Sequence, residues 1–586
     1  MRAKDIIKNV IKTKWKLIMF LSIFTLVLIA VRVASPFVIK YMIDEIVGGK
    51  NVSGVPHVEG DLVPISLILV GLSLVGYIFN SLRCSFTTRI GSEITLELKT
   101  QAYSSVLRAD LLEINKLDTD ETFKAIEDST RRIGHIFFGE NFISFCTNIL
   151  IYIGLLVAMF VLSPIMGAVA LAGSIIFYIV HKVINYIHLR QTFKHEQLRK
   201  TQDESVSESI KSIKSIKVRN SLKAEEASYR AFAQKLENSA RLEANFGSQE
   251  NFLLNEFIVN LTFVAAFGVI GAFIADDTMN VNFGTLLGYV YLIPTLYSVL
   301  HNLMRVSPLP SIATTAFEEI NSVLSIKQEN RVVTVKELSE IYSLQFDDVS
   351  FDYANDNNFH LQNISFEVRK GETLGILGLA NSGKSTIIDL ATKIIRPKQG
   401  KVLINNCDIN KVDTYYLRDQ IASIPQDAKL YHGTIEHNVI YPMEMDEYRY
   451  NDALNKCHLK PLINGLPKHD QTIVDDDSDI ITAIEKQRIV LANAFYKDAK
   501  IYLLDDATSK FDAISEKEMM DEIIKLKNKI TIIVSNRINS LVKCSKILIL
   551  NGGKIVEYGD TEKLIGDSSS AFAKMVKDAK SSRKIG

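Results

Sequence analysis

The sequence predicts a membrane-embedded bundle of α-helices in its first half and an α/β domain in its second half. Two observations point to this division of the 586 residues. Long apolar stretches crowd the first half, and each is near the ~20 residues that a helix needs to cross a bilayer. The second half carries a glycine-rich segment, Gly378–Thr386, between a strand-like and a helix-like run. A chain of this length is also too long for one domain.

Six apolar stretches qualify as membrane spans by length. They are Leu17–Ile39, Leu62–Phe79, Phe138–Leu162, Gly167–Ile187, Phe252–Ile274 and Phe283–Leu303. Their number and continuity argue against the buried helices of a soluble protein. The second stretch is the weakest of the six, because it contains Ser and Gly.

The distribution of positive charge predicts the orientation of these spans. Six basic residues precede the first span, which places the N-terminus in the cytoplasm. They are Arg2, Lys4, Lys8, Lys12, Lys14 and Lys16. The connections Arg83–Gly134 and His188–Asn251 then face the cytoplasm, and each could form two helical arms of about 30 residues that extend ~45 Å. The connections Asp44–Asp61, Ser163-Pro164 and Asp276–Asn282 face the outside. The sequence therefore predicts a multi-pass protein of the cell (plasma) membrane.

Polar residues within or near the spans are candidates for the wall of a cavity. A charged group in lipid is costly, so such side chains should face the interior of the bundle. The candidates are Glu140, Asn148, Glu256, Asn260, His301 and Arg305. Several lie near span ends, where extension of the side chain toward water is an equal explanation.

Composition excludes some functions. The chain has 67 Lys and Arg and 67 Asp and Glu, and a formal net charge of zero does not favour a nucleic-acid partner. Five cysteines are scattered without a C-x-x-C pair, so neither a metal site nor a disulfide framework is indicated. The repeat Ser209–Lys217, with Ile and Lys every third residue, is interpreted as an exposed helix with an Ile stripe against its neighbours.

The segment GLANSGKST fits the phosphate-binding loop G-x-x-x-x-G-K-[ST]. Glycines allow backbone N–H groups to surround phosphates at the positive end of the following helix. Lys384 would reach the β- and γ-phosphates, and Ser385 would ligate Mg²⁺. The predicted nucleotide-binding residues of this loop are Gly378, Asn381, Ser382, Gly383, Lys384, Ser385 and Thr386.

A second feature supports nucleotide binding. The apolar run Ile501–Leu504 is followed by two carboxylates, Asp505 and Asp506. A buried strand that places an Asp at its end is how proteins with this loop position Mg²⁺. Asp505 is therefore a predicted metal ligand together with Ser385.

From about Leu344 to Ser568 the chain resembles the nucleotide-binding domain of an ABC transporter. The matching segments are Tyr353 in SFDY, Gln426 in SIPQD, Gly433-Thr434-Ile435 with Asn438, Ser509–Asp512, and Gly553–Gly559. The resemblance implies that ATP is the nucleotide and that Tyr353 stacks on adenine. It also implies that Gln426 contacts Mg²⁺ and the transport domain. The long cytoplasmic loops of the first half are similar to those of ABC exporters, with coupling helices expected near Ala109–Lys116 and within or after Arg190–Thr201.

The resemblance has a first departure at the signature motif LSGGQ. Lys486–Ala492 fixes the register and places Ile481-Thr482-Ala483-Ile484-Glu485 on this motif. In the family, this segment contacts the γ-phosphate held by the opposite subunit, which makes Thr482 and Ala483 the candidate contacts. Thr482 keeps a hydroxyl. Ile484 adds a side chain where close backbone approach is needed, and Glu485 adds a negative charge near phosphate.

Two further departures concern hydrolysis. Asp506 stands at the position of the catalytic Glu and is one methylene shorter, and Asn536 stands at the position of the switch His. Asn can hydrogen-bond but cannot carry the imidazole's proton. A positioned base is typically worth ~10²–10⁴ in rate. We therefore expect a site that binds ATP and hydrolyses it poorly; the alternative is that these residues are tolerated variants of a working site.

The sequence as a whole predicts half of an ABC exporter: six transmembrane helices with long cytoplasmic extensions, then one α/β P-loop ABC ATPase domain. The expected boundaries are 1–306 for the transmembrane domain, 307–342 for a linker, 343–570 for the nucleotide-binding domain and 571–586 for a polar tail, of which Asp578–Gly586 is expected to be frayed. Such halves work as pairs, and the altered motifs favour a heterodimer with a second, more standard half-transporter.

Alternatives to this assembly remain open at the level of the sequence. One is a non-hydrolysing, ATP-gated regulatory membrane subunit, and another is a slow homodimer. Family heterodimers usually place their altered motifs in one composite site, whereas here all of them lie on one chain. The substrate of a membrane cavity is expected to be amphipathic: a peptide, a lipid or a hydrophobic drug.

Overall fold

The computed structural model describes residues 2–48, 62–275, 283–306, 309–329, 335, 337–338, 340–353, 360–476, 478 and 480–582. The predicted outside connection Asp276–Asn282, and most of Asp44–Asp61, lie outside these residues. The chain divides into two compact units. Unit 1 contains Met1–Arg108 and Leu117–Ile326, and unit 2 contains Ala109–Lys116 and Lys327–Gly586.

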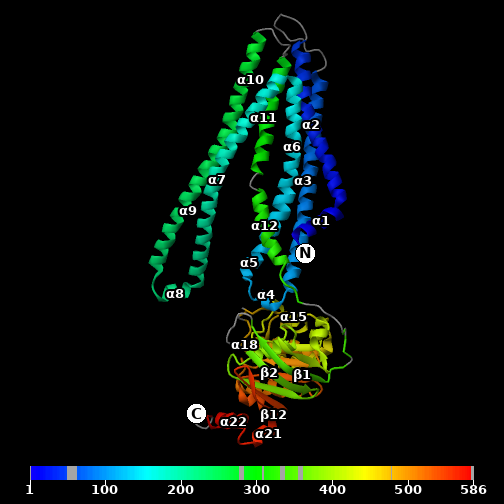
Figure 1. The fold of residues 1–586 in the computed structure, drawn as a ribbon, viewed down its shortest axis with the longest axis vertical. Helices are drawn as coiled ribbons and strands as arrows, with labels where there is room; N and C mark the ends of the chain where they lie inside the picture. The colour runs from blue at the N-terminus through cyan, green and yellow to red at the C-terminus, as the bar shows by residue number, and fades with distance from the viewer. Residues whose placement is uncertain are drawn as a thin grey trace. The chain divides into compact units, whose positions relative to one another are not determined.

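Unit 1 is built from long helices (Figure 1). They are α1 (Ala3–Thr13), α2 (Trp15–Gly48), α3 (Leu62–Leu107), α5 (Thr119–Lys124), α6 (Ile143–Leu162), α7 (Pro164–Lys211), α8 (Ile213–Val218), α9 (Leu222–Asn251), α10 (Ile258–Ala275), α11 (Phe283–Arg305) and α12 (Leu309–Leu324). Wider π-helical turns at Ala125–Ser129, Arg132–Phe142 and Phe252–Phe257 connect several of them. Helices α7 and α9 lie side by side, with α8 at their end.

Among the described residues, five helices are long and apolar enough to cross a membrane. They begin at Trp15, Val63, Glu121, Pro164 and Leu222 and overlap five of the six predicted spans. The sixth predicted span is the helix α11. The apolar side chains of these helices face outward to a large extent: only 6% of the most apolar window of α3 is buried. An apolar surface of this extent requires an apolar solvent, as a bilayer provides.

The interior of unit 1 has two apolar clusters. One joins α6, α7, α10 and α11 around Leu155, Phe177 and Tyr297. Polar groups there are paired: the Tyr297 hydroxyl lies 2.9 Å from Thr262 Oγ1, and the Tyr289 hydroxyl donates to backbone carbonyls at the α6–α7 turn. The second cluster joins α1, α3 and α12 around Ile94 and Leu98.

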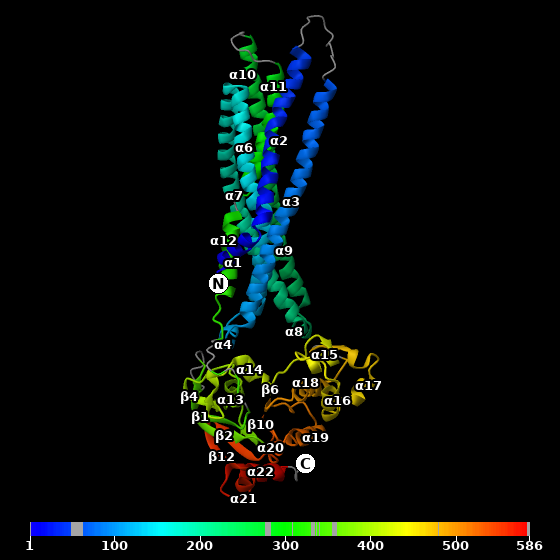
Figure 2. The ribbon, with the colours of Figure 1, turned by 90° about the vertical axis from the view of Figure 1, so that its right-hand side faces the viewer.

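Unit 2 contains two larger sheets with helices packed against them (Figure 2). The six-stranded sheet has the order β12-β11-β3-β10-β9-β6, and the four-stranded sheet has the order β2-β1-β4-β5. A short ladder pairs β7 with β8. The strands are β1 (Ser343–Asp352), β2 (His360–Arg369), β3 (Thr373–Gly378), β4 (Gln399–Ile404), β5 (Cys407–Asp408), β6 (Ile421–Ile424), β7 (Gly433–Thr434), β8 (Ile473–Val474), β9 (Ile501–Asp505), β10 (Ile530–Val534), β11 (Lys546–Asn551) and β12 (Lys554–Asp560).

The helices of unit 2 come between these strands in sequence. They are α13 (Lys384–Ala391), α14 (Thr414–Asp419), α15 (Ile435–Ile440), α16 (Glu447–Lys456), α17 (Lys460–Gly465), α18 (Ala483–Lys497), α19 (Ala513–Ile524), α20 (Ile538–Leu541), α21 (Thr561–Gly566) and α22 (Ala571–Ser582). In the six-stranded sheet, β6, β9, β10, β3 and β11 pair in parallel. Their carboxyl ends therefore meet at one edge, where ligands of such sheets bind.

A short segment from the first half of the chain belongs to unit 2. The helix α4 (Leu111–Ile114) lies in Ala109–Lys116, the region where a coupling helix is expected. The Asp110 N–H donates to the Lys327 carbonyl at 2.9 Å, and Leu112 packs against the apolar cluster beneath the four-stranded sheet. The Asp110 side chain caps this helix by accepting from the Leu112 N–H.

The predicted linker and tail are more ordered than expected. Helix α12 occupies much of the predicted linker and belongs to unit 1, because Ala316, Ile320 and Val323 recur at helical spacing and are buried. The predicted tail begins with helix α22, since Phe572 and Val576 pack into the core of unit 2. Helix α22 continues to Ser582, into the segment Asp578–Gly586 that was expected to be frayed.

Candidate functional site: a nucleotide-binding site

The predicted site residues converge because four parallel strands end at the same edge of the six-stranded sheet. The phosphate loop follows β3, Gln426 follows β6, Asp505 ends β9 and Asn536 follows β10. Strand β9 is fully buried, so the position of Asp505 is fixed by the core. Gln426 is exposed and lies just after β6, at this edge.

The phosphate loop has the backbone that its glycines permit. Gly383 has φ of 102° and directly precedes α13, and Asn381 has φ of 60°, a conformation that Asn tolerates. A Cβ atom on Gly378 would lie 2.6 Å from the Leu550 carbonyl oxygen, so a larger residue does not fit. The buried hydroxyl of Ser382 has no hydrogen-bond partner among the described residues. The helix-like run after the loop forms α13, which begins at Lys384 and ends at Ala391.

The charged groups of the loop lie close to the carboxylates. The Lys384 ammonium donates to the carbonyls of Gly378 and Leu379 at 2.9 and 2.8 Å. Burial lowers the pKa of Lys384, and the negative charges of Asp506 and Asp505 reduce this effect. Burial raises the pKa of Asp505, and a hydrogen bond from Ser385 acts in the opposite direction. Ser385 and Asp505 thus place two oxygen donors together, the ligand type that Mg²⁺ prefers.

Tyr353 lies beside the start of α13. Its hydroxyl is 3.3 Å from Thr386 Oγ1, and its ring meets Phe351 edge to face with centroids 4.8 Å apart. Burial raises the pKa of the Tyr353 hydroxyl. The aromatic ring expected to stack on adenine is thereby held next to the phosphate loop.

Asp506 and Asn536 contact each other directly. The backbone N–H of Asn536 donates to Asp506 Oδ1 at 3.3 Å, and its side-chain amide donates to Oδ2 at 3.4 Å. These bonds are long, but they engage both carboxylate oxygens. Asp506 also adopts a left-handed backbone conformation with φ of 47°, which Asp tolerates better than most residues.

The signature segment forms the N-terminus of α18. Thr482 caps the helix: its hydroxyl accepts from the Glu485 N–H at 3.3 Å. Glu485 accepts in return from the Thr482 N–H at 2.7 Å and from the Thr482 hydroxyl at 2.8 Å. This is a complete capping box. Thr482 and Ala483 are exposed. The Thr482 hydroxyl is nevertheless already hydrogen-bonded to the Glu485 carboxylate.

Two residues of the site were missed by the sequence analysis. Arg537 donates to the carbonyls of Phe511 at 3.0 Å and Ser509 at 2.8 Å, and it pairs with Glu516 at 2.5 Å. It thereby joins the segment after β10 to Ser509–Asp512. Asp389 on α13 is a half-buried carboxyl whose pKa is raised to about 6 by burial and by the charge of Asp505. In the sequence, the sign that Arg537 belongs to the site is its position directly after Asn536, which stands at the switch position.

The structure brings the predicted cavity residues of unit 1 into no common site. The side chains of Glu140 and Arg305 lie outside the described residues. Glu256 and Asn260 are exposed, and Asn148 and His301 are half-buried. Cavity lining by these residues stays a prediction.

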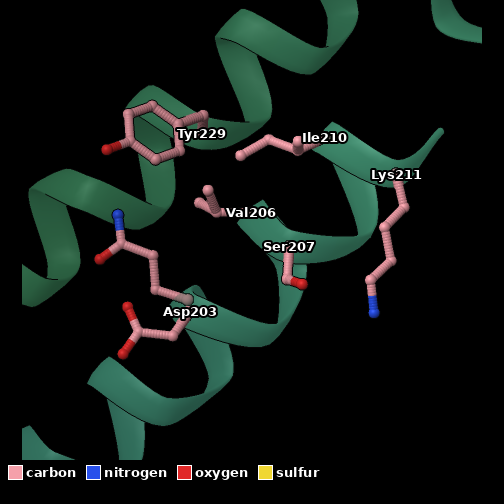
Figure 3. A pocket seen from close by; sticks show the side chains of 7 residues that line it. Asp203, Val206, Ser207, Ile210, Lys211 and Tyr229 are labelled. Carbon is pink, nitrogen blue, oxygen red and sulfur yellow. The ribbon is translucent and has the colours of Figure 1, made fainter. Parts of the chain in front are cut away.

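An open groove lies between α7 and α9. Figure 3 shows Tyr229 of α9 facing Val206 and Ile210 of α7. Ile210 and Ile213 of the predicted repeat are largely exposed, so the expected packing of an Ile stripe against its neighbours is wrong for these two positions. Helix α7 ends at Lys211, within the repeat.

Comparisons with known proteins agree with the fold. The family model for the ABC transporter transmembrane region matches residues 18–300, and the model for the ABC transporter ATP-binding domain matches residues 361–509. The ATP-dependent lipid A-core flippase of Paraburkholderia xenovorans is 28% identical over 64% of this chain and 62% of its own length. The flippase of the same name from Cupriavidus metallidurans is 25% identical over 91% of this chain and 88% of its own length.

A solved structure shows the same fold. The structure of a bacterial Atm1-family ABC exporter with ATP bound matches with a TM-score of 0.77 and 22% identity, over 96% of this chain and 98% of that chain. The fold and the site define a membrane protein with a P-loop ATP-binding domain. The chain belongs to the ABC transporters, with one transmembrane region and one ATP-binding domain, and it has the fold of an exporter half-transporter.

Proposed function

We propose that this chain is the weakly hydrolysing half of a heterodimeric exporter that moves an amphipathic substrate across the plasma membrane. Its partner is a second half-transporter with more standard motifs, and the N-terminus and the ATP-binding domain lie in the cytoplasm. A lipid substrate is supported by the names of the two relatives, which are lipid A-core flippases.

ATP binding uses the residues that the site holds together. In this proposal, Tyr353 stacks on adenine, backbone N–H groups of the loop bind the phosphates, and Lys384 contacts the β- and γ-phosphates. Ser385, Asp505 and Gln426 hold Mg²⁺, which would neutralise phosphate charge when bound. The hydrogen bond between Ser385 and Asp505 supports this assignment, because it brings two of the three donors together.

The observation that carries weak hydrolysis is the contact between Asp506 and Asn536. The two groups that would orient and accept a proton from the attacking water instead hydrogen-bond to each other. The short Asp506 side chain thereby accepts a hydrogen bond from an amide, and an amide cannot act as a general acid or base. A water in line with the γ-phosphate would lack a positioned base.

The signature segment supports pairing with a different chain. Glu485 uses its carboxylate to cap α18, so its negative charge is fixed at the end that would face a partner's γ-phosphate. A helix N-terminus ordinarily attracts an anion, and a carboxylate already placed there competes with phosphate. Two copies of this chain would therefore form two poor composite sites.

The test is the double substitution Asp506→Glu with Asn536→His. ATPase activity is measured for the lone chain and for the complex that co-purifies from native membranes. In a mixed dimer whose partner supplies a standard signature segment, activity should rise by up to ~10²–10⁴. In a homodimer, Ile484 and Glu485 still impair the opposing face, and the change should be small.

Three outcomes would overturn parts of this proposal. Brisk hydrolysis by the unmodified lone chain would reject weak hydrolysis. Recovery of self-dimers alone, with transport, would reject the heterodimer in favour of a slow homodimer. Rates that stay unchanged in both assemblies would mean that the base and switch positions do not limit turnover, as in a regulatory subunit.

A further inference from the structure

A largely buried carboxylate lies next to the hydrolysis side of the ATP site. Glu516 on α19 keeps only 12% of its side chain exposed, and it pairs with Arg537 at 2.5 Å. A carboxylate at this depth is costly unless it is paired and hydrogen-bonded. Glu516 has no part in the proposed binding of ATP and Mg²⁺, so its burial requires another explanation.

Glu516 accepts hydrogen bonds from three different segments. Oε2 accepts from Arg537, which follows β10. Oε1 accepts from the hydroxyl of Ser540 on α20, and from that of Thr508, which follows β9, at 3.4 Å. Thr508 and Ser540 are both buried. Both oxygens of one carboxylate therefore connect α19 to the ends of the two neighbouring strands.

Arg537 holds the backbone of the turn that begins at Asp506. Its guanidinium donates to the carbonyls of Ser509 at 2.8 Å and of Phe511 at 3.0 Å. The turn itself is closed by two bonds, from the Ser509 N–H to the Asp506 carbonyl at 2.9 Å and from the Phe511 N–H to the Thr508 carbonyl at 3.1 Å. Asp506 has φ of 47°, and such a conformation persists only where its surroundings hold it.

The same arginine directly follows Asn536. The bonds from Asn536 to Asp506 are 3.3 and 3.4 Å long, and bonds of this length are weak. On the other side of Asn536, the buried Ser535 donates its N–H to the Ile376 carbonyl at 3.2 Å and accepts from the Arg537 N–H at 3.0 Å. Asn536 thus lies between two residues that are fixed by stronger contacts than its own.

We propose that Arg537 and Glu516 are a positioning pair for the hydrolysis side of the ATP site. They set the separation of the side chains at positions 506 and 536, and they act through these two residues rather than on ATP. The pair suits this role because charge-assisted bonds hold their geometry well, and a displacement of about 1 Å at a catalytic group can cost ~10²-fold in rate. The inference rests on the proposed ATP site and adds to it two residues outside the nucleotide's own ligands.

The first experiment uses the complex that co-purifies from native membranes, with Asp506→Glu and Asn536→His in this chain. Adding Arg537→Ala should reduce the gain in kcat from these changes about tenfold, while KM for ATP stays within about twofold, because the phosphate loop is unaltered. Glu516→Gln should have a smaller effect in the same direction. Arg537→Lys keeps the charge but not the fork, so its kcat should lie between those of Arg537→Ala and the parent.

The matched control removes an arginine that is also ion-paired. Arg369→Ala breaks the pair with Glu367 at 3.1 Å, on β2 of the four-stranded sheet. It should change neither kcat nor KM. A loss of kcat equal to that of Arg537→Ala would mean that any lost ion pair slows the domain, and would overturn the proposal.

A second measurement does not depend on hydrolysis. Amide hydrogen exchange is followed in the full chain with its natural residues at 506 and 536. Arg537→Ala should accelerate exchange of the Ser509 and Phe511 N–H groups and leave α13 unchanged. Unchanged exchange at both amides would show that Arg537 does not hold this turn.

The remaining outcomes also decide the proposal. A raised KM with unchanged kcat would place the pair in ATP binding and reject the positioning role. If Arg537→Ala unfolds the domain, exchange in α13 accelerates as well, and Glu516→Gln, which keeps the size of the side chain, then carries the test. If Asp506→Glu with Asn536→His restores no hydrolysis, the proposed cause of weak hydrolysis fails, while the exchange measurement still decides whether Arg537 holds the turn.

Discussion

The two sides of the ATP site differ in how their polar groups are used. On the side that binds phosphate, Ser382 keeps an unpartnered hydroxyl and the loop keeps every expected residue. On the side of hydrolysis and subunit contact, Asp506 is hydrogen-bonded to Asn536, and Glu485 to Thr482. Each altered residue therefore has a hydrogen-bond partner close by in the same chain. Binding and hydrolysis can be separated in one site without loss of structure, because each replacement brings its own partner.

The contrast between the phosphate-binding side and the hydrolysis side of the ATP site is tested most strongly by Lys384→Ala. If the phosphate side is fully functional, loss of this ammonium should weaken ATP binding on the order of a hundredfold, since charge-assisted bonds to phosphate disappear. Calorimetric titration of the purified chain measures this, with Lys401→Ala on the exposed part of β4 as the control. An unchanged affinity would contradict the assignment of the loop as the nucleotide site.

A smaller effect is expected from Glu485→Ala on the other side. The capping box of α18 loses its carboxylate, and the Thr482 N–H loses its partner. Thermal unfolding should show a destabilisation of about 1 kcal/mol. Glu447→Ala, in the first turn of α16, is the control, because that helix is capped by Asp446, whose side chain accepts from the Arg449 N–H. Equal stability of the two variants would mean that Glu485 has no structural role, and its charge would then need a functional explanation.

An effect of similar size, but one that depends on pH, concerns Asp389. Its pKa is raised to about 6 in the folded chain, mainly by burial. The folded state thus binds more protons than the unfolded state between the ordinary Asp range and about pH 6, so stability falls as pH rises through this window. Asp389→Asn removes the effect and should be the more stable protein at pH 7.5, on the order of 1 kcal/mol after allowance for solvent screening. Near pH 4 the two proteins should be alike; the same difference at both values would reject this role of Asp389.

The parts that sequence predicted well are those set by local pattern. The phosphate loop needs only its own glycines and Lys384, and the strand before Asp505 is apolar throughout. The capping box was also readable, since Thr482 and Glu485 have the required spacing, but the resemblance to a signature motif directed attention to phosphate instead. Helix α12 was readable from its apolar spacing as well.

Other parts depend on contacts between distant segments. Helix α22 is held by a core site for Phe572 that is built from other elements. The bonds from Asn536 to Asp506 depend on β10 lying beside β9, and on both strands ending at the same level.

The membership of Ala109–Lys116 in unit 2 has a mechanical consequence. The chain leaves unit 1 after Arg108, returns to it at Leu117 and leaves it again after Ile326. Three peptide connections therefore join the two units, where a simple fusion of two domains would have one. A displacement of the ATP-binding unit must act on the end of α3 and on the start of α5 through covalent bonds, before any non-covalent contact is considered. Force from the ATP site can thus reach a 46-residue helix directly.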